Sequence, residues 1–283
     1  MNNARINVGS QGVQIAERAT QQALAYALDR VQSARAGAED RTPVAIMDHP
    51  DVRRMLLRMR SLTEAMRGLL YYTAGQVDRG DVGDAAAKAR AEVLVPMLKA
   101  WATDTGIEVA SLGIQVHGGM GFVEETGAAQ HFRDARIAPI YEGTNGIQAA
   151  DLVTRKLGLE NGEVLQALFA DIARDTGDEP QLQALAGECA AIAKWMREDA
   201  SLDDRLAGSV PFTTMCAVAV AGWCLTKQHV ALTESDDAQR THAKRVTMRF
   251  FLDHIVPEAI GLKASATAGA GLLYELDGSV LAA

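Results

Sequence analysis

One carboxylate stands out by its surroundings, in the run Ile-Tyr-Glu-Gly-Thr at positions 140–144. The proline before this run and the glycine within it predict a tight turn between two helices, with Thr144 or Asn145 capping the second helix. The apolar pair before Glu142 can desolvate its carboxylate, and desolvation raises a carboxyl pKa toward the range of a general base. The alternative is a solvated glutamate in a glycine-rich turn, and the spacing alone leaves both open.

A second candidate functional stretch, which could bind a ligand, is Gln-Val-His-Gly-Gly-Met-Gly-Phe at positions 115–122. Its three glycines are expected to end a helix and to let the backbone approach a ligand. The stretch lacks the preceding strand of a dinucleotide-binding motif, so taken alone it is a weak signal. His117 is interpreted as a structural or turn histidine. No metal site is predicted, because the three cysteines lack metal-ligand spacing and are interpreted as reduced thiols in the core.

Composition narrows the class of protein. The 283 residues are 48% hydrophobic, which is enough for a globular core, and the net charge of −8 is not gathered into blocks. This argues against a nucleic acid or an anionic membrane as the main partner. The first residues lack the basic stretch followed by an apolar stretch that is typical of a signal peptide, so a cytoplasmic protein is expected. The apolar segment 210–225 is shorter than a bilayer-spanning helix and is predicted to be a buried bundle helix, with no membrane span.

The elements that must position these residues are helices. Apolar residues recur at helical spacing in the first half of the chain, and no stretch there reads as a strand. We predict helices at 8–30, 52–70, 85–116, 124–132 and 147–157. Pro96 must either kink the third helix or lie in its first turn. The small residues of the first helix, such as Gly12, permit close helix packing. The prediction is an all-α fold that begins with a four-helix bundle, residues 1–158.

The glycines at 158 and 162 mark a boundary, and residues 159–283 are predicted to form a second helical bundle. Its helices are expected at 164–172, 180–206, 211–232 and 237–256, with Pro257 ending the last. The tail residues 272–274, Leu-Leu-Tyr, are expected to dock on the bundle. Lys244 and Arg245 are interpreted as part of a solvated face, with contact to a substrate or between domains as the lesser alternative.

The segment 133–148 closely resembles the catalytic-base segment of the acyl-CoA dehydrogenases. The resemblance covers residues 2–157 through several separated motifs in the family's order. Residues 158–283 more loosely resemble the helical tail of long bacterial members, including the 3-methylmercaptopropionyl-CoA dehydrogenase-like proteins. In that family a helical domain and a β-domain precede the bundle, where this sequence starts. The resemblance therefore implies either the carboxy-terminal part of a longer enzyme or a truncated product that needs a partner.

The resemblance also implies roles for residues at the turn. Glu142 matches the catalytic base, which removes the α-proton of an acyl-CoA thioester, and its backbone N–H matches the donor to the thioester carbonyl. Tyr141 and Gly143 fall at substrate-binding positions beside it. Arg5 matches an arginine near the substrate and the base.

FAD is the cofactor that the resemblance implies. Arg30 matches an arginine on the flavin pyrophosphate, and Gln32 occupies the contact position two residues further on. Thr144 matches another cofactor contact. The remaining matches, to positions that contact the FAD of a neighbouring subunit, are Gln115, Gly118 and Gly119.

The implied reaction is α,β-dehydrogenation of an acyl-CoA to a trans-2-enoyl-CoA, with hydride transfer to flavin and electron-transfer flavoprotein as the acceptor. A homodimer or homotetramer is expected. The competing hypothesis is a truncated, non-catalytic helical oligomerisation or scaffold module derived from the same family.

Overall fold

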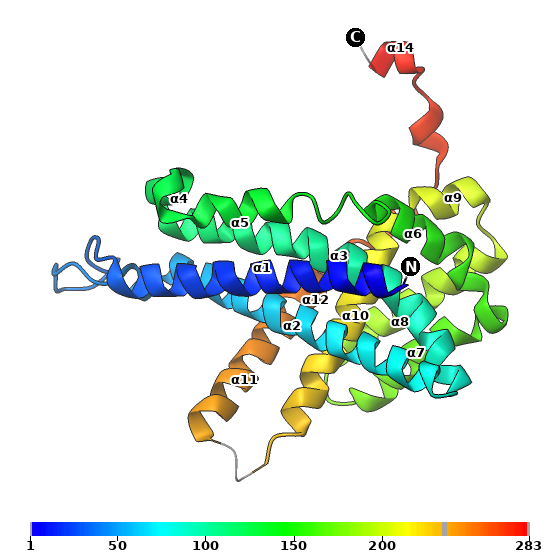
Figure 1. Ribbon diagram of the computed structural model, residues 1–283, viewed down its shortest axis with the longest axis horizontal. Coiled ribbons are helices and arrows are strands. Elements are labelled where there is room, and N and C mark those ends of the chain that lie inside the picture. Colours follow the sequence, from blue (N-terminus) through cyan, green and yellow to red (C-terminus); the bar gives the residue numbers. More distant parts are fainter. Residues whose placement is uncertain (1, 234–236, 282–283) are drawn as a thin grey trace.

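A computed structural model of the chain describes residues 2–233 and 237–281. Within these ranges the elements are all helical (Figure 1), and the one bridge of β type is an isolated antiparallel pair between Val31 and Ala45. The all-α prediction is confirmed.

Three long helices form the body of the first half. They are α1 (Asn2–Asp29), α2 (Pro50–Asp81) and α3 (Ala85–His117), joined by a long loop with a 3₁₀ turn at Ile46–Asp48 and by a tight turn. A fourth, interrupted helix lies along α3 in Figure 1, made of α5 (Ala128–Ala135) and α6 (Asn145–Thr154). The short α4 (Gly119–Phe122) and a 3₁₀ turn (Glu124–Thr126) connect α3 to α5. The gap between α5 and α6 holds the turn that carries Glu142.

The helices α1 and α3 approach closely at small residues. A Cβ atom built on Gly12 would lie 2.3 Å from the carbonyl oxygen of Ala102, and one built on Gly106 would lie 2.9 Å from the carbonyl oxygen of Gly12. Backbone therefore packs on backbone at this crossing, as the small residues of the first helix predicted.

The second half surrounds one buried helix. It comprises a 3₁₀ segment (Lys156–Gly162), α7 (Glu163–Asp175), α8 (Pro180–Glu198), α9 (Leu202–Ala207), α10 (Ser209–Val230), α11 (Ala238–Phe250), a π-helical turn (Phe251–Ile255), α12 (Val256–Gly261), α13 (Lys263–Ala266), a 3₁₀ turn (Gly271–Tyr274) and α14 (Gly278–Leu281). α10 packs against α2, α3, α6 and α8. Its apolar window is long enough to cross a membrane, yet 83% of that window is buried in the protein, as in a core helix.

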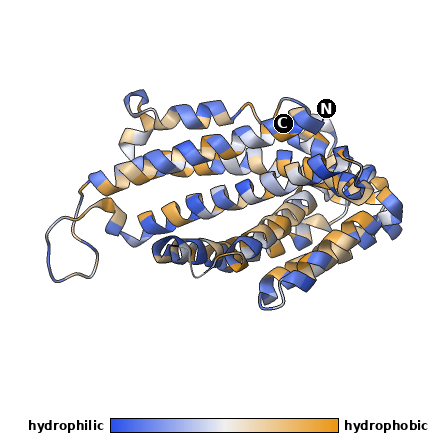
Figure 2. Ribbon diagram, turned by 60° about the horizontal axis from the view of Figure 1, so that its bottom comes forward, coloured by the Kyte–Doolittle hydropathy of each residue, from blue (hydrophilic) through white to orange (hydrophobic). Residues whose placement is uncertain are grey.

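A single hydrophobic cluster includes residues from both predicted domains, such as Leu94 on α3 and Met215 on α10. The outer helices carry alternating hydrophobic and hydrophilic stripes (Figure 2), as expected for helices with one face on a core. The division at residues 158 and 159 stays a prediction. Lys244 does contact the first half, since its Nζ atom lies 2.7 Å from Oε2 of Glu64 on α2.

One alternative for Pro96 is excluded, and two predicted helix boundaries were wrong. Pro96 lies in the interior of α3, which excludes the first-turn alternative. The predicted helix 180–206 is two helices, because Ser201 and Asp204 form a capping box that starts α9. Pro257 does not end the helix begun by α11. The π-helical turn Phe251–Ile255 joins α11 to α12, and Pro257 lies in the first turn of α12, so the chain stays helical through the proline.

The predicted docking of the tail was also wrong. Leu272, Leu273 and Tyr274 are 79%, 61% and 73% exposed, and in Figure 1 the end of the chain projects away from the bundle. The backbone just before these residues is anchored at Ala270, whose N–H donates to Oδ1 of Asp204 at 2.9 Å. The three side chains lie beyond this anchor, and the apolar pattern alone could not show that no groove receives them.

Candidate functional site

The turn between α5 and α6 has an unusual backbone. Glu142 and Gly143 both have a left-handed conformation, with φ of +58° and +83°. The backbone N–H of Asn145 closes the turn by donating to the carbonyl oxygen of Pro139 at 2.9 Å. Thr144 then caps α6, because its Oγ1 accepts from the N–H of Ile147 at 3.3 Å. The sequence predicted this turn, and Thr144 is the one of its two candidates that caps the helix.

A buried lysine lies beneath the turn. The side chain of Lys99, on α3, is fully buried. Its Nζ atom donates to the carbonyl oxygen of Gly143 at 2.8 Å and to Oδ1 of Asn145 at 2.9 Å. Burial lowers the pKa of Lys99 to about 8, against the opposing influence of the Asp104 carboxylate. Sequence reasoning missed Lys99, because a lysine in an apolar helix reads as a solvated residue until its partners are known.

Gln148, on the first turns of α6, holds the same segment from another side. Its Nε2 atom donates to the carbonyl oxygens of Glu142 at 3.4 Å and Gly143 at 3.3 Å. The side chain is fully buried, and its Oε1 atom has no hydrogen-bond partner among the described residues. Both carbonyl groups of the left-handed pair are therefore bound by buried side chains, and Gln148 was also missed from sequence.

The outer side of the turn is open. Glu142 is exposed, so the described chain does not supply the desolvation that the sequence suggested. Its backbone N–H donates to no acceptor within residues 2–233 and 237–281. Three apolar side chains around the turn are about half exposed: Ile137 at 56%, Ile140 at 48% and Ile147 at 57%. An exposed carboxylate, an N–H donor without a described acceptor and three half-exposed apolar side chains thus lie within residues 137–147.

Two predicted substrate residues are bound to neighbouring side chains. The hydroxyl of Tyr141 donates to Oε1 of Gln11 on α1. Arg5 is largely buried, and its Nη1 atom lies 3.8 Å from Oδ2 of Asp151. Arg5 makes no ion pair with Glu142, yet both charges act on the pKa of Lys99, which Arg5 lowers and Glu142 raises. Lys99 is therefore within electrostatic reach of both Arg5 and Glu142.

The predicted cofactor residues at the glycine-rich turn come together in a cavity of about 570 Å³. Its walls include Arg30, Gln32, Gln115, Gly118 and Gly119. Arg30 is exposed and has no ion-pair partner in the described part of the chain, so its guanidinium is available to an anionic group.

The glycines in this cavity fit a ligand that approaches the backbone. Gly118 has a φ of +61°, which requires glycine for conformational reasons. Gly119 has no such φ, and a Cβ atom built on it would meet nothing within 4 Å. Packing within the described chain therefore does not explain the glycine at 119, whereas a phosphate-bearing group lying on the backbone would.

His117 belongs to the scaffold of this cavity. Its Nδ1 atom lies 2.7 Å from the carbonyl oxygen of Gly113, and its ring stacks on Tyr26 with centroids 4.3 Å apart. The interpretation as a structural histidine is confirmed.

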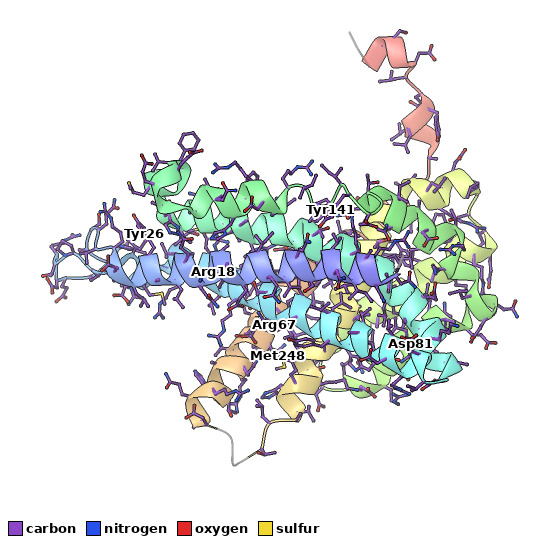
Figure 3. All side chains as sticks on the ribbon, viewed as in Figure 1. Arg18, Tyr26, Arg67, Asp81, Tyr141 and Met248 are labelled. Atoms are coloured by element: carbon purple, nitrogen blue, oxygen red, sulfur yellow. The ribbon has the colours of Figure 1, made fainter. Side chains whose placement is uncertain are left out.

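The cavity and the Glu142 turn lie at different places along the bundle. Figure 3 shows Tyr26, in the cavity wall, toward one end of α1 and Tyr141 toward the other. Tyr141 contacts Gln11, which is 15 residues from Tyr26 on the same helix. At about 1.5 Å of rise per residue these two α1 positions are roughly 22 Å apart. Of the predicted cofactor residues, Thr144 is with Glu142 and the other five are at the cavity.

Comparison with known proteins assigns the class. Residues 1–157 match the family model for the acyl-CoA dehydrogenase C-terminal domain, and residues 169–277 match the model described as acetyl-CoA dehydrogenase C-terminal like. The chain belongs to the acyl-CoA dehydrogenase family and corresponds to its carboxy-terminal region.

Individual relatives are bacterial enzymes. The 3-methylmercaptopropionyl-CoA dehydrogenase of Ruegeria pomeroyi is 43% identical over 91% of this chain and 47% of that protein. A butyryl-CoA dehydrogenase of Syntrophomonas wolfei is 37% identical over 61% of this chain and 29% of its own length. The broad-specificity linear acyl-CoA dehydrogenase FadE5 of Mycobacterium tuberculosis is 30% identical over 86% of this chain and 44% of its own. The chain thus spans about half, or less, of these relatives.

Solved structures share the fold. The acyl-CoA dehydrogenase of Bacillus anthracis complexed with FAD has a TM-score of 0.74 at 19% identity, covering 99% of this chain and 50% of that one. Caenorhabditis elegans ACDH-11 in complex with C11-CoA has a TM-score of 0.71 at 18% identity, covering 90% of this chain and 43% of that one. Both likenesses concern the fold, and they extend across both helical halves of this chain.

Proposed function

We propose that this chain is the carboxy-terminal part of an FAD-dependent acyl-CoA dehydrogenase in which Glu142 is the catalytic base. The observation that carries the proposal is the exposed left-handed turn, where a carboxylate and a backbone N–H without an acceptor among the described residues lie between half-exposed isoleucines. The reaction is removal of two hydrogens across Cα and Cβ of an acyl-CoA thioester, which gives a trans-2-enoyl-CoA.

Each group of the turn has a task in this reaction. The carboxylate of Glu142 accepts the α-proton, and the backbone N–H of Glu142 donates to the thioester carbonyl, where negative charge develops. The exposed isoleucines cover the acyl chain and exclude water. Because Glu142 is exposed in this chain, its desolvation is supplied by the substrate, the cofactor and protein surfaces that cover the turn.

FAD, when bound, supplies the hydride acceptor, and electron-transfer flavoprotein is the proposed reoxidant. Thr144 would hold the cofactor that works with Glu142. Arg30, Gln32, Gln115, Gly118 and Gly119 would hold a second FAD molecule, because their cavity is remote from the turn. One chain then serves two flavins, and this arrangement requires at least a homodimer. Light scattering that shows a strict monomer of the flavin-loaded protein would contradict it.

The decisive experiment compares Glu142→Gln with Glu160→Gln in the flavin-loaded protein. Glu160 is a matched control, since it is also exposed and also has a left-handed φ, of +50°. We expect Glu142→Gln to retain the flavin absorbance and to lose bleaching by an acyl-CoA, and we expect Glu160→Gln to bleach normally. Normal bleaching in Glu142→Gln would refute the base.

The purified chain should be titrated with FAD before this comparison. A chain that takes up no FAD is not active by itself, and the two variants are then compared in the full-length enzyme. If the full-length enzyme also binds no flavin, the scaffold hypothesis replaces the enzymatic one.

A further inference from the structure

We propose that Lys99 is a positioning residue for Glu142: its buried ammonium group holds the left-handed turn in the conformation that presents the carboxylate and the N–H to substrate. This inference rests on the proposed role of Glu142 as the base.

The turn needs such a support. A left-handed conformation is unfavourable for a residue with a Cβ atom, and Glu142 adopts it directly before another left-handed residue, Gly143. The backbone hydrogen bond that spans the pair is the one from Asn145 to Pro139. The carbonyl of Gly143 is instead bound from below by Lys99 at 2.8 Å and by Gln148 at 3.3 Å.

The Lys99 side chain hydrogen-bonds to the turn and not to a carboxylate. Its two hydrogen-bond acceptors are the carbonyl oxygen of Gly143 and the side-chain oxygen of Asn145, and within the described residues it forms no ion pair. Asn145 is fastened in turn to α3, where its Nδ2 atom donates to the carbonyl oxygen of Ala100 and to Oγ1 of Thr103. A fully buried ammonium is unfavourable without compensation. Here its compensation comes from atoms of the turn that carries the base.

The surrounding charges agree with this role. Asp104 lies on the same helix, one turn or so beyond Lys99. Its attraction and that of Glu142 favour the charged form of Lys99, while Arg5 from α1 opposes it. Glu142 and Lys99 are thus coupled electrostatically as well as through the backbone of Gly143.

Lys156 provides the matched control. It is also a buried lysine of this bundle, but its Nζ atom pairs with the carboxylate of Glu92 and not with the turn. Lys156→Met therefore removes a buried cation and leaves the support of the turn intact. A purely structural role for Lys99 predicts that Lys99→Met and Lys156→Met have the same consequences.

The first test is amide hydrogen exchange of Asn145 in the chain, because this N–H closes the turn. We expect about tenfold faster exchange in Lys99→Met than in Lys156→Met, with shifted amide resonances at Glu142 and Gly143. Lys99→Gln, which keeps a donor, should lie between the wild type and Lys99→Met, and it replaces Lys99→Met if that variant does not fold. Equal exchange at Asn145 in both lysine variants would overturn the inference.

The second test is the rate of flavin bleaching by an acyl-CoA in the flavin-loaded protein. Lys99→Met should reduce the rate at saturating substrate about tenfold or more, with little change in the half-saturating concentration, because the base is displaced while the substrate surface remains. A rate within twofold of Lys156→Met would also overturn the inference. If Glu142→Gln bleaches normally, the proposed function itself has failed, and the exchange measurement still shows whether Lys99 holds the turn.

Discussion

Arg58 on α2 and Glu258 on α12 form a bidentate ion pair in which both guanidinium Nη atoms lie 2.7 Å from the carboxylate oxygens. The Nε atom of the same arginine donates to Glu108 on α3 at 2.5 Å. These two carboxylates raise the pKa of Arg58 further above its ordinary range. One largely buried guanidinium therefore joins the two helical halves of the protein.

We predict that Arg58→Met lowers the free energy of unfolding by about 1–3 kcal/mol, because it leaves two acidic side chains close together without their cation. Urea denaturation followed by circular dichroism measures the change. The control is Arg54→Met on the same helix, whose pair with Asp51 is exposed on both sides. It should change stability by less than about 0.5 kcal/mol. An equal effect of the two variants would show that the Arg58 ion pairs stabilise the protein no more than an exposed pair does.

The contact between α1 and α3 makes a second prediction. Gly12→Ala places a methyl group where the carbonyl oxygen of Ala102 lies 2.3 Å away, so the two helices must separate. We expect a loss of about 2–4 kcal/mol of unfolding free energy or failure to fold. Gly75→Ala on α2 is the control, since a Cβ atom there meets nothing within 4 Å and the position is helical. It should stabilise the protein by about 0.5–1 kcal/mol. Thermal unfolding of both variants checks the opposite signs.

The exposed tail gives a third prediction. Truncation after Ala270 removes Leu272, Leu273 and Tyr274, which bury little surface. We expect the free energy of unfolding to change by less than about 0.5 kcal/mol in urea. Asp204→Ala is the comparison, because it removes both the capping box of α9 and the anchor of Ala270, and it should cost about 1–2 kcal/mol. A large loss on truncation would show that the tail packs on the protein after all.

The spacing of apolar residues was sufficient to predict the long helices, because a long apolar stripe at helical spacing can be buried in few ways other than a helix that packs on a core. It was insufficient where a single local contact decides the outcome. The capping box at Ser201 divides one apolar pattern into two helices, and the π-helical turn before Pro257 continues a helix that the proline seemed to end. The capping box and the π-helical turn depend on which local hydrogen bonds form, and the spacing of apolar residues does not predict these bonds.

The candidate site also has features that the local sequence predicts and features that it does not. The turn around Glu142 could be predicted because glycine, proline and a capping threonine are local signals. The support beneath it could not, since Lys99 is 44 positions from Gly143 in sequence and meets it only through the packing of α3 on the turn. The exposure of Glu142 was equally out of reach, because desolvation depends on what covers the turn and not on its neighbours in the chain.

The last prediction concerns the pH dependence of stability that Lys99 should confer. Its pKa in the folded protein is about 8, against 10.5 for an ordinary lysine. Between these pH values the unfolded chain binds the proton more tightly than the folded one. The stability of the wild type should therefore rise from pH 8 to pH 10.5 relative to Lys99→Met, by up to about 3 kcal/mol. Below pH 8 Lys99 is charged in both the folded and the unfolded protein. The difference in unfolding free energy between the wild type and Lys99→Met should therefore be constant there.

Urea unfolding of the wild type and of Lys99→Met at a series of pH values gives the difference in their unfolding free energies. The contributions of titrating groups that the two proteins share cancel in this difference. Lys194→Met is the control, since Lys194 is exposed, with 67% of its side chain accessible to solvent. Its difference from the wild type should change little over the same range. A flat difference for Lys99→Met would mean that Lys99 keeps an ordinary pKa, and that the Gly143 carbonyl and the Asn145 side chain, with the nearby carboxylates, fully compensate its burial.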